Sequence, residues 1–414
     1  MLILSLVVAS CMFVEPVSVP PPDLSGFLLG TYPLDSTQKH ILEGIYLVDA
    51  GAGVFGPTVV LKWTSKTHLT VLTGENITYL VLGAGRLDSV FFFEGYWRSQ
   101  NSRRTGSARF EIRKDRGGRR LMGDSLAPPS LMIEGTIGDE GSSIHVVFRY
   151  QWGIRQEVQD QRFWVIAHRG GGSMSDLHPH SENTVEIIRI AERYGANGVE
   201  IDVRLTKDGM PILYHDNTIN SRLVQKTPMI GPVEDYTFPQ LRTFVRLLHG
   251  ERIPTLEEAL TTIVYETNLK FVWLDSKTEG RDLVKRMVPL LQQYTAEAAA
   301  LAVQGLRDSL EILIGVPSDA IYEELLRYPT FALIPSIAEK SLDKARALHS
   351  VVWAPLWSGG VDVAENAIAH SEGRRIFVWT LDEPPFVREF VNSAQYDGIL
   401  SDYPMIVAYY HYVR

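Results

Sequence analysis

Two carboxylates with the spacing of a shared strand face stand near the middle of the chain. Glu200 and Asp202 lie two residues apart in the run GVEIDVRL at 198–205, and strand side chains repeat every two residues, so both point to one side. Carboxylates this close repel each other unless a cation lies between them. Their oxygens suit a hard divalent ion such as Mg²⁺ or Ca²⁺. The pattern therefore predicts a metal site.

A predicted hairpin brings a histidine to the same carboxylates. Asp208-Gly209 separates the carboxylate run from the next run, at 211–216, and is a strong signal for a two-residue turn. Such a turn places His215 directly across from Asp202, with the two β-carbons about 5 Å apart. Two carboxylates and an imidazole then converge on one patch, unless a bulge shifts the register. The alternative interpretation is a solvated polar face of the hairpin.

A third carboxylate and a lysine stand at the end of another strand-like run. Asp275 and Lys277 share a face of KFVWLDSK, at 270–277, by the same two-residue period. Barrel enzymes place their catalytic groups at the carboxyl ends of strands, where Asp275 could complete the metal site and Lys277 could bind a phosphate oxygen. Taken alone, such a pair is more often a surface ion pair.

The elements that must position these groups change in character along the chain. From about residue 26 to 152, eight short strand-like runs are separated by turn residues, which predicts an antiparallel β-barrel or β-sandwich over residues 24–155. Later runs alternate with amphipathic helical patterns, which predicts an α/β fold, a (β/α)8 barrel, over residues 160–414. Nine strand candidates, one of them at 330–337, exceed the eight of a barrel, and one strand of the hairpin accounts for the surplus.

The first residues predict export. Residues 2–9 are apolar but too few to span a bilayer as a helix. They end in Val8-Ala9-Ser10-Cys11, which resembles a bacterial lipoprotein signal whose cysteine is lipidated, although no Lys or Arg precedes the apolar run. We expect residues 1–23 to be a signal and a Pro-rich spacer, and the protein to be a membrane-anchored lipoprotein or a periplasmic or extracellular protein. A frayed apolar terminus is the alternative.

Composition limits the partners. The chain of 414 residues is 45% hydrophobic and 21% charged, with a formal net charge of -9 and no long acidic run. These values are typical of a globular protein and give no reason to expect a nucleic-acid partner. A single cysteine excludes an intrachain disulfide. A phosphate site in such an acidic chain has to obtain its positive potential locally, from a cation or from a few Arg and Lys side chains.

The segment from Val165 to Pro404 resembles the glycerophosphodiester phosphodiesterase family. Each of the matching motifs is weak alone, but their order and spacing together are specific. They are His168-Arg169-Gly170, Glu182-Asn183-Thr184, Glu200-Ile-Asp202-Val203 with Leu205 to Gly209, His215-Asp216, Ile253 to Glu258, Trp379-Thr380 and Asp397 to Pro404.

The resemblance implies metal-dependent hydrolysis of glycerophosphodiesters to glycerol 3-phosphate and an alcohol, with Ca²⁺ or Mg²⁺ as cofactor. The roles that it implies are metal ligands at Glu200 and Asp202, an acid–base pair at His168 and His215, and phosphate contacts at Arg169 and Lys277. The family usually has Glu where this chain has Asp275, so we expect an altered metal distance or preference. The sequence leaves open which histidine is the acid and whether water or a glycerol hydroxyl attacks.

Other residues have weaker assignments. Trp379 is a candidate for packing against the glycerol backbone, with ordinary barrel packing as the alternative. Glu182 and Asn183 are expected to cap the helix that begins at Thr184. Two other functions stay open: a related phospholipase, similar to sphingomyelinase D or cleaving phosphoinositides, and a non-catalytic, lipid-anchored binding protein.

Overall fold

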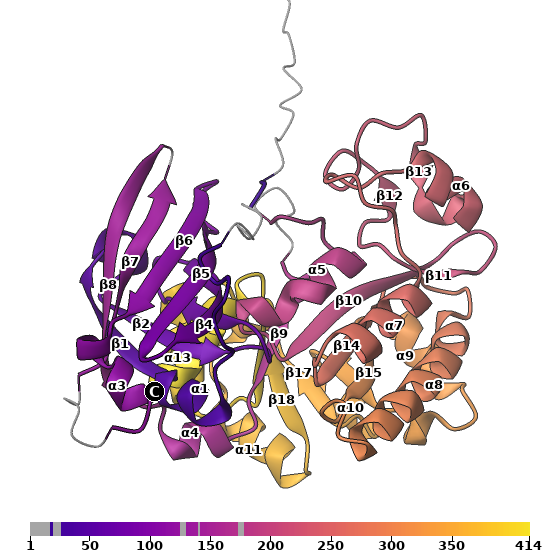
Figure 1. Cartoon of the computed structure of the whole chain (residues 1–414). Helices are drawn as coiled ribbons and strands as arrows, with labels where there is room; N and C mark the ends of the chain where they lie inside the picture. Colours follow the sequence, from indigo (N-terminus) through magenta and orange to yellow (C-terminus); the bar gives the residue numbers. More distant parts are fainter. Residues whose placement is uncertain (1–16, 20–25, 125–129, 140, 173–177) are drawn as a thin grey trace, which may run out of the picture.

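A computed structural model describes the chain at residues 17–19, 26–124, 130–139, 141–172 and 178–414. Two barrels lie side by side, an antiparallel one from the first part of the chain and a parallel one from the second (Figure 1). The expected lipidation signal at Cys11 and most of the Pro-rich spacer lie outside the described residues, so export stays a prediction. Among the described residues, every helix is too short or too polar to cross a membrane.

The first barrel closes from eight antiparallel strands, each paired with the next and the last with the first. This outcome confirms the predicted all-β fold in its barrel form. The strands are β1 (Gly44–Ala50), β2 (Thr58–Trp63), β3 (Leu69–Leu72), β4 (Thr78–Leu87), β5 (Val90–Ser99), β6 (Thr105–Ile112), β7 (Met132–Asp139) and β8 (Ser142–Trp152), with helices α1 (Ser36–Leu42), α2 (Ala52–Phe55) and α3 (Gly118–Leu121) at the ends.

Aromatic side chains fill the interior of the antiparallel barrel. Phe91, Phe93 and Trp97 alternate inward along β5 and are fully buried in one core with Phe110 of the adjacent β6 and Tyr46 of the more distant β1. An eight-stranded barrel is just wide enough for side chains to fill it. The interior is therefore a packed core.

The second barrel is the predicted (β/α)8 fold. Its eight parallel strands are β9 (Trp164–Ala167), β10 (Gly198–Leu205), β14 (Phe271–Ser276), β15 (Glu311–Val316), β16 (Ser336–Glu339), β17 (Val352–Ala354), β18 (Arg375–Val378) and β19 (Gly398–Ser401), and β19 pairs with β9. Helices surround them: α4 (Gln156–Asp160), α5 (Val185–Ile190), α7 (Leu256–Glu266), α8 (Leu283–Val303), α9 (Asp319–Leu326), α10 (Leu342–Ala347), α11 (Val363–Ser371), α12 (Pro384–Ser393) and α13 (Pro404–Val413).

The strands of this barrel alternate between two apolar cores. Val199, Ile201 and Val203 of β10 face outward and pack against the helices, whereas Trp273 of β14 and Phe377 of β18 belong to the core inside the barrel. The two-residue period produces this division. Any polar residue at an inward position near the carboxyl end of a strand must therefore lie at the mouth of the barrel.

The predicted hairpin forms, but its register is wrong by one residue. Strand β11 (Pro211–Leu213) pairs antiparallel with β10 outside the barrel, which confirms it as the surplus strand. Its turn has three residues instead of two, because the Thr206 N–H donates to the Met210 carbonyl at 3.0 Å. Tyr214, and not His215, consequently lies across from Asp202 and donates its N–H to the Asp202 carbonyl at 3.1 Å.

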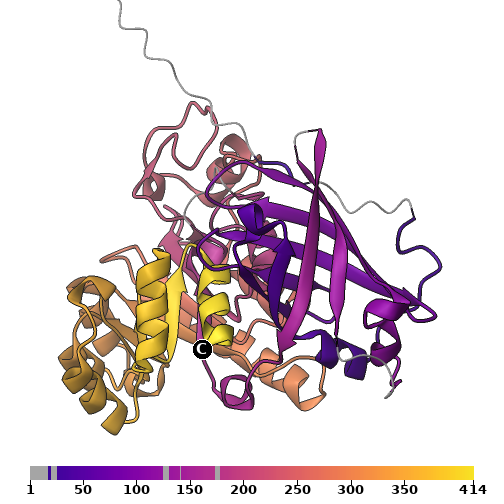
Figure 2. The same ribbon diagram turned by 90° about the vertical axis from the view of Figure 1, so that its left-hand side faces the viewer.

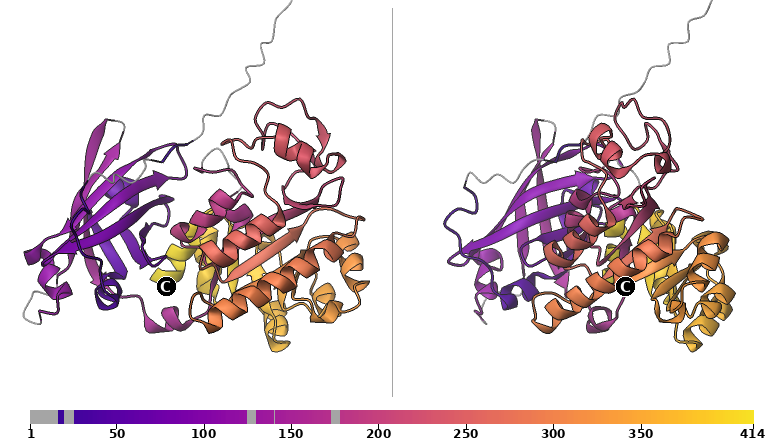
Figure 3. Two further views of the ribbon diagram at one scale, coloured as in Figure 1. Left: turned by 45° about the vertical axis from the view of Figure 1, so that its right-hand side comes forward. Right: turned by 90° about the vertical axis from the view of Figure 1, so that its right-hand side faces the viewer.

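A lobe follows the hairpin and stands above the mouth of the barrel (Figures 1 and 3). It contains β12 (Thr218–Ile219), β13 (Gly231–Pro232) and α6 (Phe238–Phe244), and it has a small core of its own around Leu223, Leu241 and Leu247. The lobe begins directly after His215, so it determines where that histidine points.

The two barrels share an apolar interface. Val60, Leu72 and Tyr79 on the outer surface of the antiparallel barrel join the same core as Ala408 of α13, and the Thr58 and Tyr409 hydroxyls are 2.6 Å apart. Figure 2 shows the two barrels in contact, with the C-terminus at their boundary. The antiparallel barrel is thus docked on the helices of the parallel one.

We expect acid to destabilise the folded chain through His411 of α13. Its ring stacks on Phe163, with centroids 4.7 Å apart, and burial, with the charge of Arg414, lowers the pKa of His411 to about 3. As the pH falls from 6.5, the unfolded chain therefore gains a proton that the folded chain does not, and the free energy of unfolding drops by about 1.4 kcal/mol per pH unit.

The variant His411→Phe tests this expectation, because it keeps an aromatic ring at this position and cannot be protonated. Urea denaturation between pH 7 and pH 5 should destabilise the wild type more steeply than this variant, and parallel pH curves would contradict the assignment.

Candidate active site

Carboxylates gather at the mouth of the parallel barrel, at the inward positions of strand ends. Glu200 and Asp202 of β10 and Asp275 of β14 offer ligand atoms that all lie within 4.8 Å of one another. Asp202 and Asp275 are direct neighbours in the register of the two strands. The structure thus brings together the three residues for which the sequence predicts a metal site.

The charge state of these carboxylates depends on cations. Burial and the charge of Asp202 raise the pKa of Glu200 to about 8, and burial also raises the pKa of Asp275. Burial acts in the same direction on Asp202, but the charges of Lys277 and His215 outweigh it and lower its pKa. The cluster therefore requires positive charge at its centre to be fully ionised.

The oxygens of this cluster fit a divalent cation. Glu200 Oε1 and Asp275 Oδ1 are buried without a hydrogen-bond partner among the described residues, and Asp202 Oδ1 accepts no hydrogen bond there and has only the ion pair with Lys277. Buried anionic oxygens cost several kcal/mol unless enough positive charge compensates them. Carboxylate oxygens are the ligands of hard cations such as Ca²⁺ and Mg²⁺. A divalent ion held by these three residues would satisfy all three oxygens.

Lys277 lies against the same carboxylates. Its ammonium group is 2.5 Å from Asp275 Oδ2 and 3.2 Å from Asp202 Oδ1. Burial opposes its charge, but the charges of Asp275 and Asp202 outweigh burial and raise the pKa of Lys277. The ammonium partly neutralises the cluster, and its predicted contact with a phosphate oxygen stays a prediction.

His168 follows β9 and is oriented by an aspartate. Its Nδ1 is 2.7 Å from Asp402 Oδ1, and its Nε2 is 3.8 Å from Glu200 Oε2. Burial disfavours the charged imidazole, but the charge and hydrogen bond of Asp402, together with Glu200, raise the pKa of His168 to about 9. With Nδ1 engaged by Asp402, Nε2 is the nitrogen that faces the cluster.

His215, which follows β11, is also oriented by an aspartate. Its Nδ1 is 2.8 Å from Asp216 Oδ1, and Asp216 in turn accepts hydrogen bonds from Arg222 and Asn220. Burial lowers the pKa of His215, against the opposing charge of Asp202. The shifted hairpin register thus leaves His215 within electrostatic reach of Asp202, although not directly across from it.

Arg169 contacts the cluster, and Trp379 directly follows β18. The Arg169 guanidinium donates to Glu182 at 2.9 Å and is 3.7 Å from Asp202, while the Arg169 backbone N–H donates to Glu200 at 2.8 Å. The half-buried Trp379 donates its indole N–H to the Ala354 carbonyl at 2.9 Å. Their contacts with substrate stay predictions.

The expected capping role of Glu182 and Asn183 is wrong. Thr184 is the N-cap of α5, and its hydroxyl accepts the Ile187 N–H. Asn183 instead forms two hydrogen bonds with Asp202, donating to Oδ2 at 2.7 Å and accepting the backbone N–H at 2.9 Å. It has a left-handed φ of 58°. This residue orients a carboxylate of the cluster.

Sequence reasoning missed Glu339 and Asp402. The strand candidate at 330–337 is misplaced, because residues Phe331–Leu333 form a 3₁₀ turn and β16 begins only at Ser336 and ends at Glu339. A strand counted from Ser336 would have put Glu339 at an inward end. Asp402 stands in a recognised motif, but its partner His168 is 234 residues away, so no local pattern reveals the pair.

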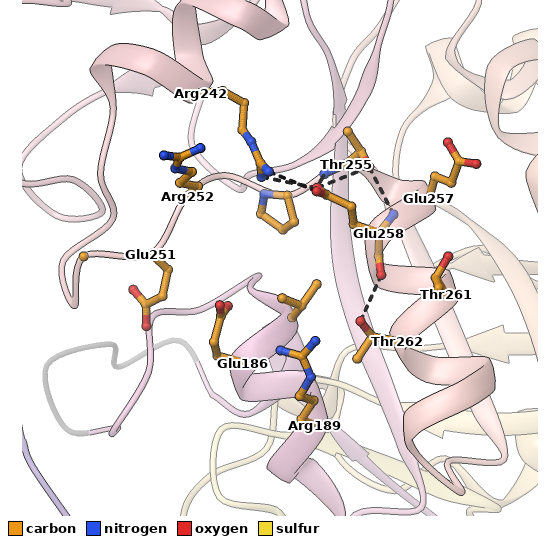
Figure 4. A pocket seen from close by; sticks show the side chains of 13 residues that line it. Glu186, Arg189, Arg242, Glu251, Arg252, Thr255, Glu257, Glu258, Thr261 and Thr262 are labelled. Carbon is orange, nitrogen blue, oxygen red and sulfur yellow. Dashed lines mark hydrogen bonds and ion pairs between the residues drawn. The ribbon is translucent and has the colours of Figure 1, made fainter.

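One pocket lies away from the carboxylates. It has a volume of about 670 Å³ and lies between α5, α7 and the loop before α7 (Figure 4). Two of the arginines that line it are already paired, Arg189 with Glu266 at 2.6 Å and Arg242 with Glu258 at 3.0 Å. None of the predicted site residues lines this pocket, so the carboxylate cluster remains the candidate active site.

Comparison with known proteins assigns the chain to a family. Residues 168–406 match the family model described as the glycerophosphoryl diester phosphodiesterase family, a match that covers more than half of the chain. The chain belongs to this family. The antiparallel barrel precedes the residues that match the family.

Individual relatives match less of the chain. Glycerophosphodiester phosphodiesterase 1 of Mus musculus is 44% identical over 108 residues, which are 24% of this chain and 30% of that protein. The chain thus spans about a third of the length of the first curated relatives that it matches. A glycerophosphodiester phosphodiesterase of Caldanaerobacter subterraneus is 26% identical over 252 residues, 58% of this chain and 94% of that protein.

Solved structures of the family are also similar. One from Silicibacter pomeroyi has a TM-score of 0.47 and 20% identity over 60% of this chain and 92% of its own. An Oleispira antarctica phosphodiesterase in complex with the product sn-glycerol-3-phosphate has a TM-score of 0.44 and 22% identity over 58% of this chain and 94% of its own.

We expect removal of Lys277 to make the protein more dependent on a divalent cation. Lys277→Met leaves Asp202 and Asp275 without their ammonium partner, so the metal-free protein should lose stability and the gain in Tm on adding Ca²⁺ should increase. Lys270→Met is the matched control, because Lys270 pairs with the exposed Asp308 just before the same strand. Thermal unfolding with EDTA and with Ca²⁺ measures both effects. An equal Ca²⁺-induced shift in wild type and Lys277→Met would contradict this expectation.

Proposed function

We propose that the chain is a metal-dependent glycerophosphodiester phosphodiesterase, which hydrolyses glycerophosphodiesters to glycerol 3-phosphate and an alcohol. One observation carries the proposal: two histidines, each with Nδ1 on an aspartate, adjoin a buried cluster of three carboxylates. His168 lies next to Glu200, and the charge of His215 helps to lower the pKa of Asp202. Membership of the family supports the choice of substrate class.

A phosphodiester resists hydrolysis for two reasons. Its negative charge repels nucleophiles, and its alkoxide is a poor leaving group. A Ca²⁺ or Mg²⁺ ion held by Glu200, Asp202 and Asp275 would neutralise charge on the phosphoryl oxygens. Lys277 and Arg169 would add donors for the same oxygens. These groups reduce the first barrier.

The histidines reduce the second barrier by proton transfer. One imidazole Nε2 takes the proton of the attacking water or hydroxyl, and the other Nε2 protonates the departing alcohol oxygen. Each such transfer contributes about 10²- to 10⁴-fold to the rate. Asp402 and Asp216 accept the Nδ1–H of His168 and His215, so that each ring presents its Nε2.

The nearest rival is a related barrel phospholipase that uses the same groups on an intact lipid. It predicts release of choline or inositol phosphates from lipid vesicles, which glycerophosphodiester hydrolysis does not. A non-catalytic binding protein is the other rival, and it predicts no turnover of either substrate class. The ordered pair of histidines beside the carboxylates favours turnover.

The direct test is release of glycerol 3-phosphate from glycerophosphocholine by the purified chain. We expect release that EDTA abolishes and that Ca²⁺ or Mg²⁺ restores. His215→Ala should lower kcat by about 10²-fold or more, because it removes one proton-transfer group. His145→Ala is the matched control, since His145 is an exposed residue of the antiparallel barrel. No release with any metal would refute the proposed function.

We expect Asp402 and Asp216 to contribute to turnover by holding the imidazole rings of His168 and His215 in place. Asp402→Asn retains the size of the side chain but loses the charge that holds His168. It should lower kcat by about 10- to 100-fold, less than the loss of the histidine itself, and leave KM for glycerophosphocholine nearly unchanged. Steady-state kinetics of Asp402→Asn and His168→Ala measure the difference. Unchanged kcat in Asp402→Asn would show that this contact has no role in turnover.

A further inference from the structure

Glu339 points into the mouth of the parallel barrel. It is the last residue of β16. Ile337, two residues earlier, belongs to the core inside the barrel, and Ala338 between them packs outward with the helices. The two-residue period of the strand therefore turns the Glu339 side chain inward, above Ile337.

The strand between Glu339 and the carboxylate cluster presents a glycine. β15 lies between β14 and β16, and its residue Gly315 pairs with Asp275 of β14. A β-carbon at Gly315 would be 2.4 Å from the indole nitrogen of Trp273, so this position has no room for a side chain. Across this gap, Asp275 and Glu200 are the carboxylates whose charges act most strongly on Glu339.

Glu339 is a buried carboxylate that forms no ion pair with the described residues, and Lys277 and Lys340 act on it only through their more distant charges. It is 6% exposed, and its Oε1 is buried without a hydrogen-bond partner among the described residues. The adjoining Lys340 is exposed, and its ammonium lies over the Trp379 ring, 5.6 Å from the centroid. A buried carboxylate that faces other carboxylates either takes up a proton or, to stay ionised, needs a nearby cation.

We propose that Glu339 is a fourth carboxylate of the cation site and makes it prefer Ca²⁺ to Mg²⁺. This inference rests on the metal dependence of the proposed function. Glu339 is not part of the compact group of three carboxylates, so an ion that also reached Glu339 would be held by a wider set of oxygens. Ca²⁺ takes about 6–8 oxygen ligands in flexible geometry, whereas Mg²⁺ requires a tight octahedron and retains waters. The wider set of oxygens suits Ca²⁺ and compensates for the short side chain of Asp275.

Cation binding by the full chain, measured by isothermal titration calorimetry with CaCl₂ and with MgCl₂, tests the inference without reference to activity. Glu339→Gln should raise the Kd for Ca²⁺ by about 10-fold or more and change the Kd for Mg²⁺ much less. Glu339→Asp keeps a carboxylate and should give an intermediate Kd for Ca²⁺. Glu383→Gln is the control for the loss of one negative charge, because Glu383 is exposed at the start of α12.

The controls separate this inference from the proposed function. Glu339→Gln removes a buried charge, so without metal its Tm should equal or exceed that of the wild type, which verifies folding. Equal Ca²⁺ affinity in wild type and Glu339→Gln, or equal losses of Ca²⁺ and Mg²⁺ affinity, would overturn the inference and leave the site of three carboxylates intact. If the wild type binds neither ion, the metal dependence of the proposed function fails, and this inference fails with it.

Discussion

Repulsion among buried carboxylates is the constraint on which the site depends. Two unit charges at most 4.8 Å apart repel by about 3.5 kcal/mol or more at an effective dielectric constant of about 20, and Glu200, Asp202 and Asp275 form three such pairs when all three are ionised. The neighbouring groups are those that such a cluster needs: the Lys277 ammonium, the Arg169 backbone N–H on Glu200, and the Asn183 amide on Asp202. These groups compensate the negative charge of the cluster only in part, so a bound cation would stabilise it.

The parallel barrel makes this concentration of charge possible, and the antiparallel barrel contacts a residue near the site. Parallel strands bring all their carboxyl ends to one mouth, and the apolar interior beneath them keeps water out. At the interface of the two barrels, Gln100 of the first contacts the buried His178 at 3.2 Å. A β-carbon on Gly172 would be 2.3 Å from the ring of His178. The first barrel thus contacts the segment that follows His168, which gives it a structural connection to the site.

The sequence predicts those parts of the site that depend only on the two-residue period of a single strand. The spacing of Glu200 and Asp202, and of Asp275 and Lys277, determines their shared faces in any strand. The hairpin register failed because a single extra residue in the turn shifts every pair, and Asp208-Gly209 is compatible with both turn lengths. Glu339 was missed because its strand begins later than the apolar run suggests. The pairing of His168 with Asp402 depends on closure of the barrel, which no local pattern encodes.

The two histidine–aspartate pairs consequently depend on different parts of the fold. His168 and Asp402 follow β9 and β19, the first and last strands of the barrel, and their contact at 2.7 Å forms only where these strands pair. His215 and Asp216 are adjacent in sequence, and Arg222 of the lobe joins Asp216 to Glu182, the partner of Arg169. Closure of the barrel therefore sets the first imidazole, whereas the lobe sets the second. A disturbance of the lobe should affect His215 while leaving the orientation of His168 intact, so the two imidazoles are positioned by separable structures around one cluster of carboxylates.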